Sequence, residues 1–289
     1  MRRHSTITHP SVDAKSQLHR LGTRAKKGLG QHFLIDHSVL EKIIEAAELV
    51  SSDTVVEVGP GLGVLTEELV KRARRVIAIE VDTRLAQSLQ KNLSKFPNLT
   101  VLNADVLQLD TQELTNKQTP EQDGYKVVAN LPYYIAAPIL RHFLEATLKP
   151  GLMVVMVQKE VAQSMVAAPG DMSILGISVQ LYGKPSIVDF VPAQSFHPQP
   201  KVDSAIVRIE VYPRPAVEVS DIAGFFALVK AGFSTPRKQI RNSLALGLRL
   251  AAEEVAQLLK QAKISPQRRP ETLSLEEWAG LQQTFANRN

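Results

Sequence analysis

The chain has 289 residues, of which 44% are hydrophobic and 22% charged, a composition ordinary for a globular protein. It contains no cysteine, which excludes disulfides and thiolate metal sites, and no apolar run approaches the roughly 20 residues of a membrane-spanning helix. The formal net charge of +5 weakly favours nucleic acid as a partner. This argument becomes stronger only if the cationic residues can be placed together.

The first 27 residues are polar and basic, with Asp13 as their one acid. They lack an apolar stretch, so they do not form a secretory signal. We expect residues 1–22 to be a flexible basic arm that can touch a phosphate backbone. An acid-poor start with Arg and Ser is also compatible with a mitochondrial transit peptide.

A glycine-bearing loop, Gly28–Leu34, precedes apolar residues at helical spacing over 38–50. His32 in this loop has no second His or carboxylate at ligand spacing nearby. It is therefore interpreted as a residue beside a ligand and not as a metal ligand.

A second glycine loop, Gly59–Gly63, lies between the strand pattern Thr54–Val58 and a helical pattern that begins at Val64. Such a loop lets backbone approach a ligand beneath a helix N-terminus. Val64 stands where a dinucleotide-binding motif needs its third glycine, and Gly63 is not followed by the Lys-Ser/Thr of a P-loop. Neither phosphate-binding motif fits.

Two further strand patterns, 75–79 and 99–102, are each followed by an acid, Glu80 and Asp105. An acid after the second strand is placed to accept from a ribose diol, and one after the third can accept from an adenine amine. Single acids at strand ends are often helix N-caps. Two of them after a glycine loop favour an adenosyl ligand without phosphates.

The next strand pattern, Tyr125–Ala129, leads into Asn130–Tyr133. Ligands of open α/β sheets bind outside the carboxyl ends of strands. The Asn130 amide, the Leu131 carbonyl before a proline and the Tyr133 ring can together grip an exocyclic amine on a stacked base. Taken alone, the four residues are more typical of a strand followed by an ordinary proline turn, and the case for a ligand depends on what surrounds them.

The remaining patterns indicate a helix over 138–148, an apolar strand over 151–157 that leads into another helix, a loop over 167–173 and a final strand over 204–211. Prolines keep Phe196–Ser204 extended and irregular. Phe196 is interpreted either as a second stacking surface or as a core residue that anchors the loop.

Tyr212–Pro215 is a stiff linker. It separates an expected domain over 23–212 from a helical domain over 216–289. Residues 222–252 contain no acid, and their cations are Lys230, Arg237, Lys238, Arg241 and Arg249. Thr235–Pro236 is expected to open a helix that carries Arg237 and Arg241 on one face. The single sign of this charge favours contacts with RNA phosphates.

Five segments in combination closely resemble the KsgA/RsmA family of small-subunit ribosomal RNA adenine dimethyltransferases, and the resemblance covers roughly residues 22–275. They are 27–34, 57–63, 130–133, 196–204 and 237–244. The resemblance implies an α/β class I S-adenosylmethionine-dependent methyltransferase fold, Rossmann-like and seven-stranded with the last strand antiparallel, and a small C-terminal all-helical domain. It also implies dimethylation of two adjacent adenosines in the 3′-terminal hairpin loop of 16S rRNA.

The resemblance assigns roles to individual residues. The implied contacts of S-adenosyl-L-methionine are His32, Leu34, Gly59, Gly61, Glu80, Asp105 and Asn130. The implied catalytic set is Asn130, Leu131, Pro132, Tyr133 and Phe196, with no metal. Three positions depart from the family pattern: His32 stands where many relatives carry Asn, and Ser164 and Pro236 stand where Arg is usual.

The implied protein is a cytoplasmic monomer without a membrane partner, acting on 16S rRNA within an immature small ribosomal subunit. Two alternatives remain. One is a 23S rRNA adenine methyltransferase of the antibiotic-resistance type, which the matches over 196–204 and 237–244 disfavour. The other is a ribosome-assembly or mitochondrial transcription factor that acts mainly by binding.

Overall fold

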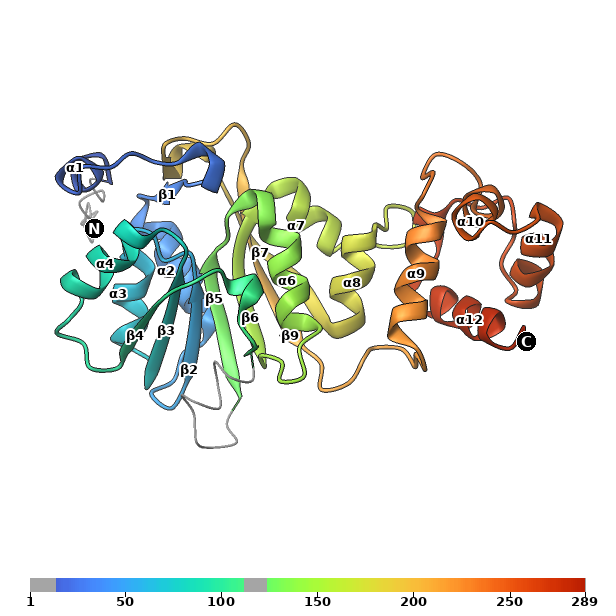
Figure 1. Cartoon of the computed structure of the whole chain (residues 1–289), viewed down its shortest axis with the longest axis horizontal. Helices are drawn as coiled ribbons and strands as arrows, with labels where there is room; N and C mark the ends of the chain where they lie inside the picture. Colours follow the sequence, from blue (N-terminus) through green and yellow to red (C-terminus); the bar gives the residue numbers. More distant parts are fainter. Residues whose placement is uncertain (1–13, 112–123, 289) are drawn as a thin grey trace, which may run out of the picture. The chain divides into compact units, whose positions relative to one another are not determined.

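The computed structural model of the chain describes residues 14–111 and 124–288 (Figure 1). The chain divides into two units. One contains residues up to Ala162 together with Ser186–Ile209, and the other contains Gln163–Pro185 and the chain from Glu210 onward. The predicted linker at 212–215 lies close to the crossing at Ile209–Glu210. The sequence patterns did not predict that residues 163–185 belong to the second unit.

A seven-stranded mixed sheet forms the framework, in the order β4-β3-β2-β5-β6-β9-β7. Its strands are β2 Thr54–Val58, β3 Arg75–Glu80, β4 Leu99–Asn103, β5 Tyr125–Asn130, β6 Leu152–Gln158, β7 Gly183–Val191 and β9 Ser204–Val211. The neighbours from β4 to β6 pair in parallel. All residues of β2 are buried, as expected of β-branched strands covered on both faces. The carboxyl ends of these five parallel strands therefore meet at one edge.

The helices of the first unit alternate with its strands, and two of the helices begin at side-chain caps. The helices are α2 His37–Ala47, α3 Val64–Val70, α4 Thr83–Asn92, α6 Ala136–Leu144 and α7 Lys159–Met165, which continues into the second unit after Ala162. Asp36 and Asp82 accept backbone N–H groups at the starts of α2 and α4. Glu48, in the left-handed region, ends α2 before the predicted limit at residue 50. The first unit also contains the 3₁₀ helices η2 Val106–Gln108, η3 Tyr133–Ile135 and η4 Ala193–Ser195.

The segment before β2 is more ordered than the flexible arm expected over residues 1–22. It contains α1 Ala14–Arg20, the 3₁₀ helix η1 Lys27–Leu29 and β1 Phe33–Leu34. Ala14 and Leu18 pack with Phe33 and Leu85. Burial of these apolar side chains fixes α1, and the expectation of a flexible arm is corrected for these residues. Residues 1–13 lie outside the described part of the chain.

A two-stranded ribbon joins distant parts of the first unit. Strand β1 pairs antiparallel with β8, Phe196–His197, so that Phe33 faces His197 and Leu34 faces Phe196. The backbone N–H of Ile35 extends the contact by donating to the Ser195 carbonyl at 2.9 Å. The segment 196–204, predicted to be irregular, thus begins with a short strand, because Pro198 interrupts the pairing only after two residues.

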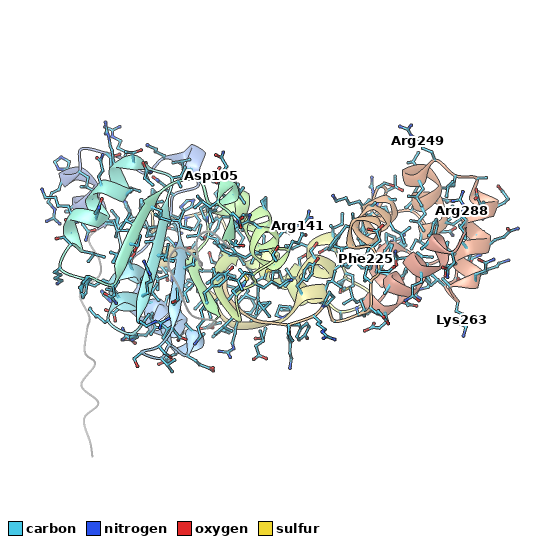
Figure 2. All side chains as sticks on the ribbon, turned by 60° about the horizontal axis from the view of Figure 1, so that its bottom comes forward. Asp105, Arg141, Phe225, Arg249, Lys263 and Arg288 are labelled. Carbon is cyan, nitrogen blue, oxygen red and sulfur yellow. The ribbon has the colours of Figure 1, made fainter. Side chains whose placement is uncertain are left out.

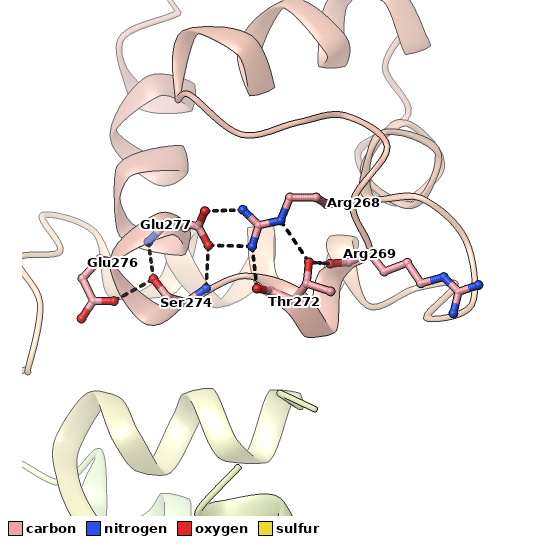
Figure 3. Close-up of polar contacts among 6 residues, drawn as sticks. All are labelled: Arg268, Arg269, Thr272, Ser274, Glu276 and Glu277. Carbon is pink, nitrogen blue, oxygen red and sulfur yellow. Dashed lines mark hydrogen bonds and ion pairs between the residues drawn. The ribbon is translucent and has the colours of Figure 1, made fainter. Parts of the chain in front are cut away.

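Helices build the second unit around Trp278, which is fully buried. They are α8 Ile174–Tyr182, α9 Ile222–Gly232, α10 Ile240–Leu248, α11 Ala252–Gln261 and α12 Leu275–Ala286, with the 3₁₀ helix η5 Pro270–Thr272. Ser274 and Glu277 form a capping box at the start of α12, and Arg268 is ion-paired with Glu277 (Figure 3). The Arg268 hydrogen bond holds the pKa of the Glu277 carboxyl below its usual range, although partial burial opposes it.

The helix start predicted at Thr235–Pro236 is wrong. Residues 235–238 form a turn in which Lys238 N–H donates to the Thr235 carbonyl, and α10 begins only at Ile240. Thr235 uses its hydroxyl to bond that of Ser243 instead of capping a helix. Arg237 and Arg241 therefore do not share a helical face.

None of the helices over residues 14–111 and 124–288 combines the length and apolarity needed to traverse a lipid bilayer.

Candidate functional site

A cavity of about 250 Å³ lies at the carboxyl ends of β2, β3, β4 and β5, roofed by the segment that leads into β1. It brings together ten of the residues that the sequence singled out: His32, Leu34, Gly59, Gly61, Glu80, Asp105, Asn130, Leu131, Pro132 and Tyr133. Their roles towards a ligand stay predictions. Their clustering follows from the parallel strands, which end at one edge of the sheet.

The loop after β2 places backbone against the cavity. Gly61 has φ +58°, and a Cβ there would approach the Phe33 ring to 3.0 Å. A side chain would thus be strained by conformation and crowded by its neighbour. The Gly61 N–H donates to Glu80 Oε2 at 3.1 Å, which ties the loop to the end of β3.

Glu80 is a buried carboxylate held by backbone. It is 4% exposed, and its Oε1 accepts from the Asp82 N–H at 2.9 Å. Burial raises the pKa of Glu80, while the backbone donors at Asp82 and Gly61 pull it back. Each oxygen keeps lone-pair capacity beyond its backbone bond, so the group can still accept from a ligand diol.

Asp105 both caps a backbone turn and lines the cavity. Its Oδ1 accepts from the Leu107 N–H at 3.0 Å and caps η2. Asn103, at the end of the same strand, donates to the Glu80 carbonyl at 2.8 Å. The predicted N-cap and the predicted ligand contact are therefore compatible in one residue.

The tip of β5 presents an oriented amide. Asn130 Nδ2 donates to the His32 carbonyl at 3.1 Å, which determines which end of the amide is nitrogen. No other residue of the described chain takes up Asn130 Oδ1 or the Leu131 carbonyl in a hydrogen bond. The Leu131 N–H continues the sheet by donating to the Met156 carbonyl at 3.1 Å. Two acceptors thus remain at this tip.

Tyr133 is fixed at both its edge and one face. Its hydroxyl bonds Ser204 Oγ at 2.5 Å, and its ring stacks on that of His32 with centroids 5.5 Å apart. Burial raises the pKa of Tyr133, and the bond to Ser204 opposes this. His32 is held in turn by Pro198, whose carbonyl accepts from Nδ1 at 2.6 Å. His32 therefore orients Tyr133 as well as lining the cavity.

Phe196 does not line the cavity. It is 2% exposed and belongs to a core cluster with Leu34 and Val39. Pairing of β8 with β1 turns its ring inward, because the neighbouring His197 takes the outward side of the two-residue strand. Of the two interpretations from the sequence, the core residue is the one observed, and the stacking surface is corrected.

Some features of the cavity were missed. Glu57, in the middle of β2, is fully buried, and burial, with a smaller contribution from the nearby Glu80 carboxylate, raises its pKa to about 8. Its Oε2 has no hydrogen-bond partner within the described residues. A lone acid inside a β-branched run was the available signal. Val81 and Tyr134, respectively 51% and 54% exposed, add apolar surface to the rim.

The predicted RNA-binding cations all lie in the second unit. Lys230, Arg237, Lys238 and Arg249 are exposed, and Arg249 points away from the helices (Figure 2). Arg241 is partly buried and donates to Asn242 Oδ1 at 3.2 Å. None of the five forms an ion pair with another described residue. Their contact with RNA stays a prediction.

Within residues 14–111 and 124–288, no cluster of three or more His, Asp or Glu side chains is placed to hold a metal ion.

The chain is similar to known proteins over most of its length. The model of a family described as ribosomal RNA adenine dimethylase matches residues 22–287. A ribosomal RNA small subunit methyltransferase A from Dehalococcoides mccartyi is 51% identical over 270 residues, which are 93% of this chain and 91% of the relative. The protein of the same name from Bacillus cereus is 44% identical over 272 residues, 92% and 93% of the two chains.

Two solved structures are similar over 88% of this chain. A dimethyladenosine transferase from Plasmodium falciparum superposes with a TM-score of 0.72 at 27% identity, over 98% of its own chain. The 23S rRNA methyltransferase ErmE superposes with a TM-score of 0.66 at 30% identity, over all of its chain.

Proposed function

This chain belongs to the ribosomal RNA adenine dimethylase family, and on that premise we propose that it dimethylates the exocyclic amines of two adjacent adenosines in the 3′-terminal hairpin loop of 16S rRNA. The methyl donor is S-adenosylmethionine, and the substrate is an immature small ribosomal subunit approached by a monomer. The observation that carries the proposal is the oriented Asn130 amide, whose free oxygen shares one cavity with Glu80 and Asp105.

The cavity suits an adenosyl group. Glu80 retains acceptor capacity for a ribose diol, and Asp105 can accept from an adenine amine. A Cβ on Gly61 would approach the Phe33 ring to 3.0 Å, so the loop has room for backbone alone at this position. S-adenosylmethionine, when bound, supplies an electrophilic methyl group on a sulfonium sulfur.

The chemical task of the protein is to activate a poor nucleophile. The lone pair of the adenine amine is delocalised into the ring. Asn130 Oδ1 and the Leu131 carbonyl accept its two hydrogens, which favours a pyramidal nitrogen with its lone pair directed away from the ring. Holding the nitrogen in this geometry lowers the barrier by orientation, without a covalent intermediate.

Tyr133 holds the extruded base. Its ring offers a stacking surface, and such stacking contributes about 1–3 kcal/mol per base. His32 supports one face and Ser204 fixes the hydroxyl. The ring is therefore positioned before the base arrives, and little freedom is lost on binding.

The first alternative is a 23S rRNA adenine methyltransferase, and the 30% identity to ErmE over 88% of this chain supports it. The curated relatives at 44–51% identity are named for the small subunit, which favours the main proposal. The other alternative is a factor that acts mainly by binding, and it gives no role to the unbonded Asn130 Oδ1.

Labelled cofactor incubated with unmethylated 30S particles, naked 16S rRNA and 23S rRNA tests the proposal. We expect the label in 30S particles, on two adjacent adenosines of the 3′-terminal hairpin loop, with two methyl groups on each. Label in 23S rRNA supports the first alternative. Absence of label from all three RNAs contradicts catalysis, and rescue of a deletion strain by a catalytically inactive variant supports the binding role.

A further inference from the structure

A second hollow, of about 970 Å³, lies beside the N-terminal helix of the first unit. Its wall is formed by side chains of α1 and of the turn up to Ala25, together with His197 and Pro198 of the β8 segment. We call it the α1 groove. It is separate from the cavity at the strand ends, because the two share no lining residue.

The wall of the α1 groove is positively charged. Lys15, Arg20 and Arg24 line it and are exposed, and the wall contains no acid. Within the described chain none of these three cations has an ion-pair partner. Lys26, just beyond, differs because it pairs with Asp82 at 2.7 Å. The charge of the groove is therefore available to an external anion.

The groove is preformed. Leu18 anchors α1 through the cluster that also contains Phe33 and Leu85. Arg84 donates to the Gly22 carbonyl at 3.2 Å and holds the turn after the helix. Pairing of Phe33 with His197 fixes the opposite wall. The cations thus belong to anchored backbone, which lowers the entropic cost of ordering them on binding.

One residue connects the groove with the catalytic cavity. Pro198 lines the α1 groove, and its carbonyl accepts from His32 Nδ1 at 2.6 Å. His32 lines the cavity and stacks on Tyr133. A polyanion whose base enters the cavity therefore has the groove within reach of its adjoining phosphates.

We propose that the α1 groove binds the sugar–phosphate backbone of the RNA next to the target adenosines, through Lys15, Arg20 and Arg24. The inference rests on the proposed function and deepens it, because it adds an RNA contact on the catalytic unit itself. Backbone contacts of this kind set register and orientation and carry no sequence information. An RNA strand fits better than an acidic protein, because the groove adjoins a cavity suited to a base.

The triple variant Lys15→Gln/Arg20→Gln/Arg24→Gln tests the proposal, with Lys91→Gln/Lys95→Gln/Lys184→Gln as a control of equal charge change at exposed sites outside the groove. Equilibrium binding to 16S rRNA is measured from low to high salt. Each lost phosphate contact reduces the slope of log K against log salt by roughly 0.7–0.9, so the slope of the groove variant should be smaller by roughly 2.1–2.7. Its KM for RNA should rise at least about tenfold at low salt, while cofactor affinity and thermal midpoint stay unchanged.

An unchanged salt slope in the groove variant, or an equal loss in the control, overturns the proposal. Polyglutamate serves as the alternative ligand: if it binds the wild type and not the groove variant, while RNA binding and its salt slope are the same in both proteins, the groove is assigned to an acidic protein. Failure of the proposed function gives a different result. The wild-type protein then does not methylate 16S rRNA, whether or not the groove binds RNA.

Discussion

At the scale of single residues, one hydrogen bond determines the chemistry available at the tip of β5. The His32 carbonyl accepts from Asn130 Nδ2, which leaves the Oδ1 of this cavity-lining residue able to accept. The amide is a donor on one side and an acceptor on the other, so its orientation is part of the mechanism. A residue 98 positions earlier in the chain sets this orientation.

Asn130→Ala should lower kcat by about 100-fold or more, the scale seen when one oriented polar group is removed from an active site. Cofactor affinity should remain within a few-fold, because Glu80 and Asp105 are intact. Single-turnover methyl transfer and calorimetric cofactor titration separate the two quantities. Asn92→Ala, on the exposed side of α4, is the control. Near-normal transfer by Asn130→Ala would rule out the proposed grip.

The buried Glu57 carboxyl should make the free energy of unfolding depend on pH. Burial raises its pKa from the ordinary 4.5 to about 8, so between these values the folded protein holds a proton that the unfolded chain has released. The free energy of unfolding of the wild type should therefore fall as pH rises through this window, with a contribution of up to about 1.4 kcal/mol per pH unit.

Glu57→Gln, which imitates the protonated form, should remove this contribution. Its free energy of unfolding should exceed that of the wild type by a margin that grows from pH 5 to pH 8. Denaturant unfolding at four pH values measures the margin, and Glu253→Gln, exposed in the second unit, is the control. Parallel pH profiles for wild type and Glu57→Gln would show that the carboxyl is not protonated in the folded protein.

At the scale of elements, the loop after β2 depends on glycine for two separate reasons. Gly61 adopts φ +58°, which costs an L-residue about 1–2 kcal/mol, and it lies against the ring of Phe33. The same loop is bonded to Glu80. A disturbance here therefore reaches the carboxylate proposed to hold the ribose.

Gly61→Ala should raise the cofactor dissociation constant at least about tenfold, since 1.4 kcal/mol of strain relieved only by moving the loop corresponds to that factor. Calorimetric titration measures it. Gly151→Ala, whose added Cβ meets nothing within 4 Å, should bind cofactor as the wild type does. Equal affinity of the two variants would show that the loop does not approach the ligand.

The elements that the sequence predicted well are those with a strong local signal. The strands Thr54–Val58 and Ser204–Val211 have the predicted limits, because β-branched residues with turn residues at both ends leave little ambiguity. The helix start predicted at Thr235 was wrong. The Thr235 hydroxyl bonds that of Ser243, eight residues away, and does not cap the backbone N–H groups that follow it. The order in α1 comes from burial against Phe33 and Leu85, which local sequence does not reveal.

At the scale of the whole molecule, the cavity at the strand ends and the predicted RNA-binding cations lie in different units. The sequence located the acids and the Asn130 motif from strand ends. It did not reveal the bonds of His32 to Pro198 or of Tyr133 to Ser204, which join residues 166 and 71 positions apart. The site residues that could be predicted are those that follow a strand within a single βα unit. Contacts between distant segments of the chain could not be predicted.

Arg237→Gln/Lys238→Gln should weaken RNA binding and leave cofactor affinity unchanged, because both cations are exposed and belong to the second unit. The salt slope should fall by roughly 1.5, from 0.7–0.9 for each lost phosphate contact. Filter binding across a salt series measures it. Lys260→Gln/Lys263→Gln, exposed in the same unit, should alter the slope less. A matching loss in both variants would indicate general attraction and no defined contact.

The ribbon of β1 and β8 has a consequence for how the protein is made. The segment that carries His32 is held over the cavity by residues 195–198, which leave the ribosome more than 160 residues later. A nascent chain that has not yet reached Phe196 thus possesses the glycine loop and both acids but not the closed roof. The closed roof therefore forms late in translation, after all five parallel strands have been synthesised.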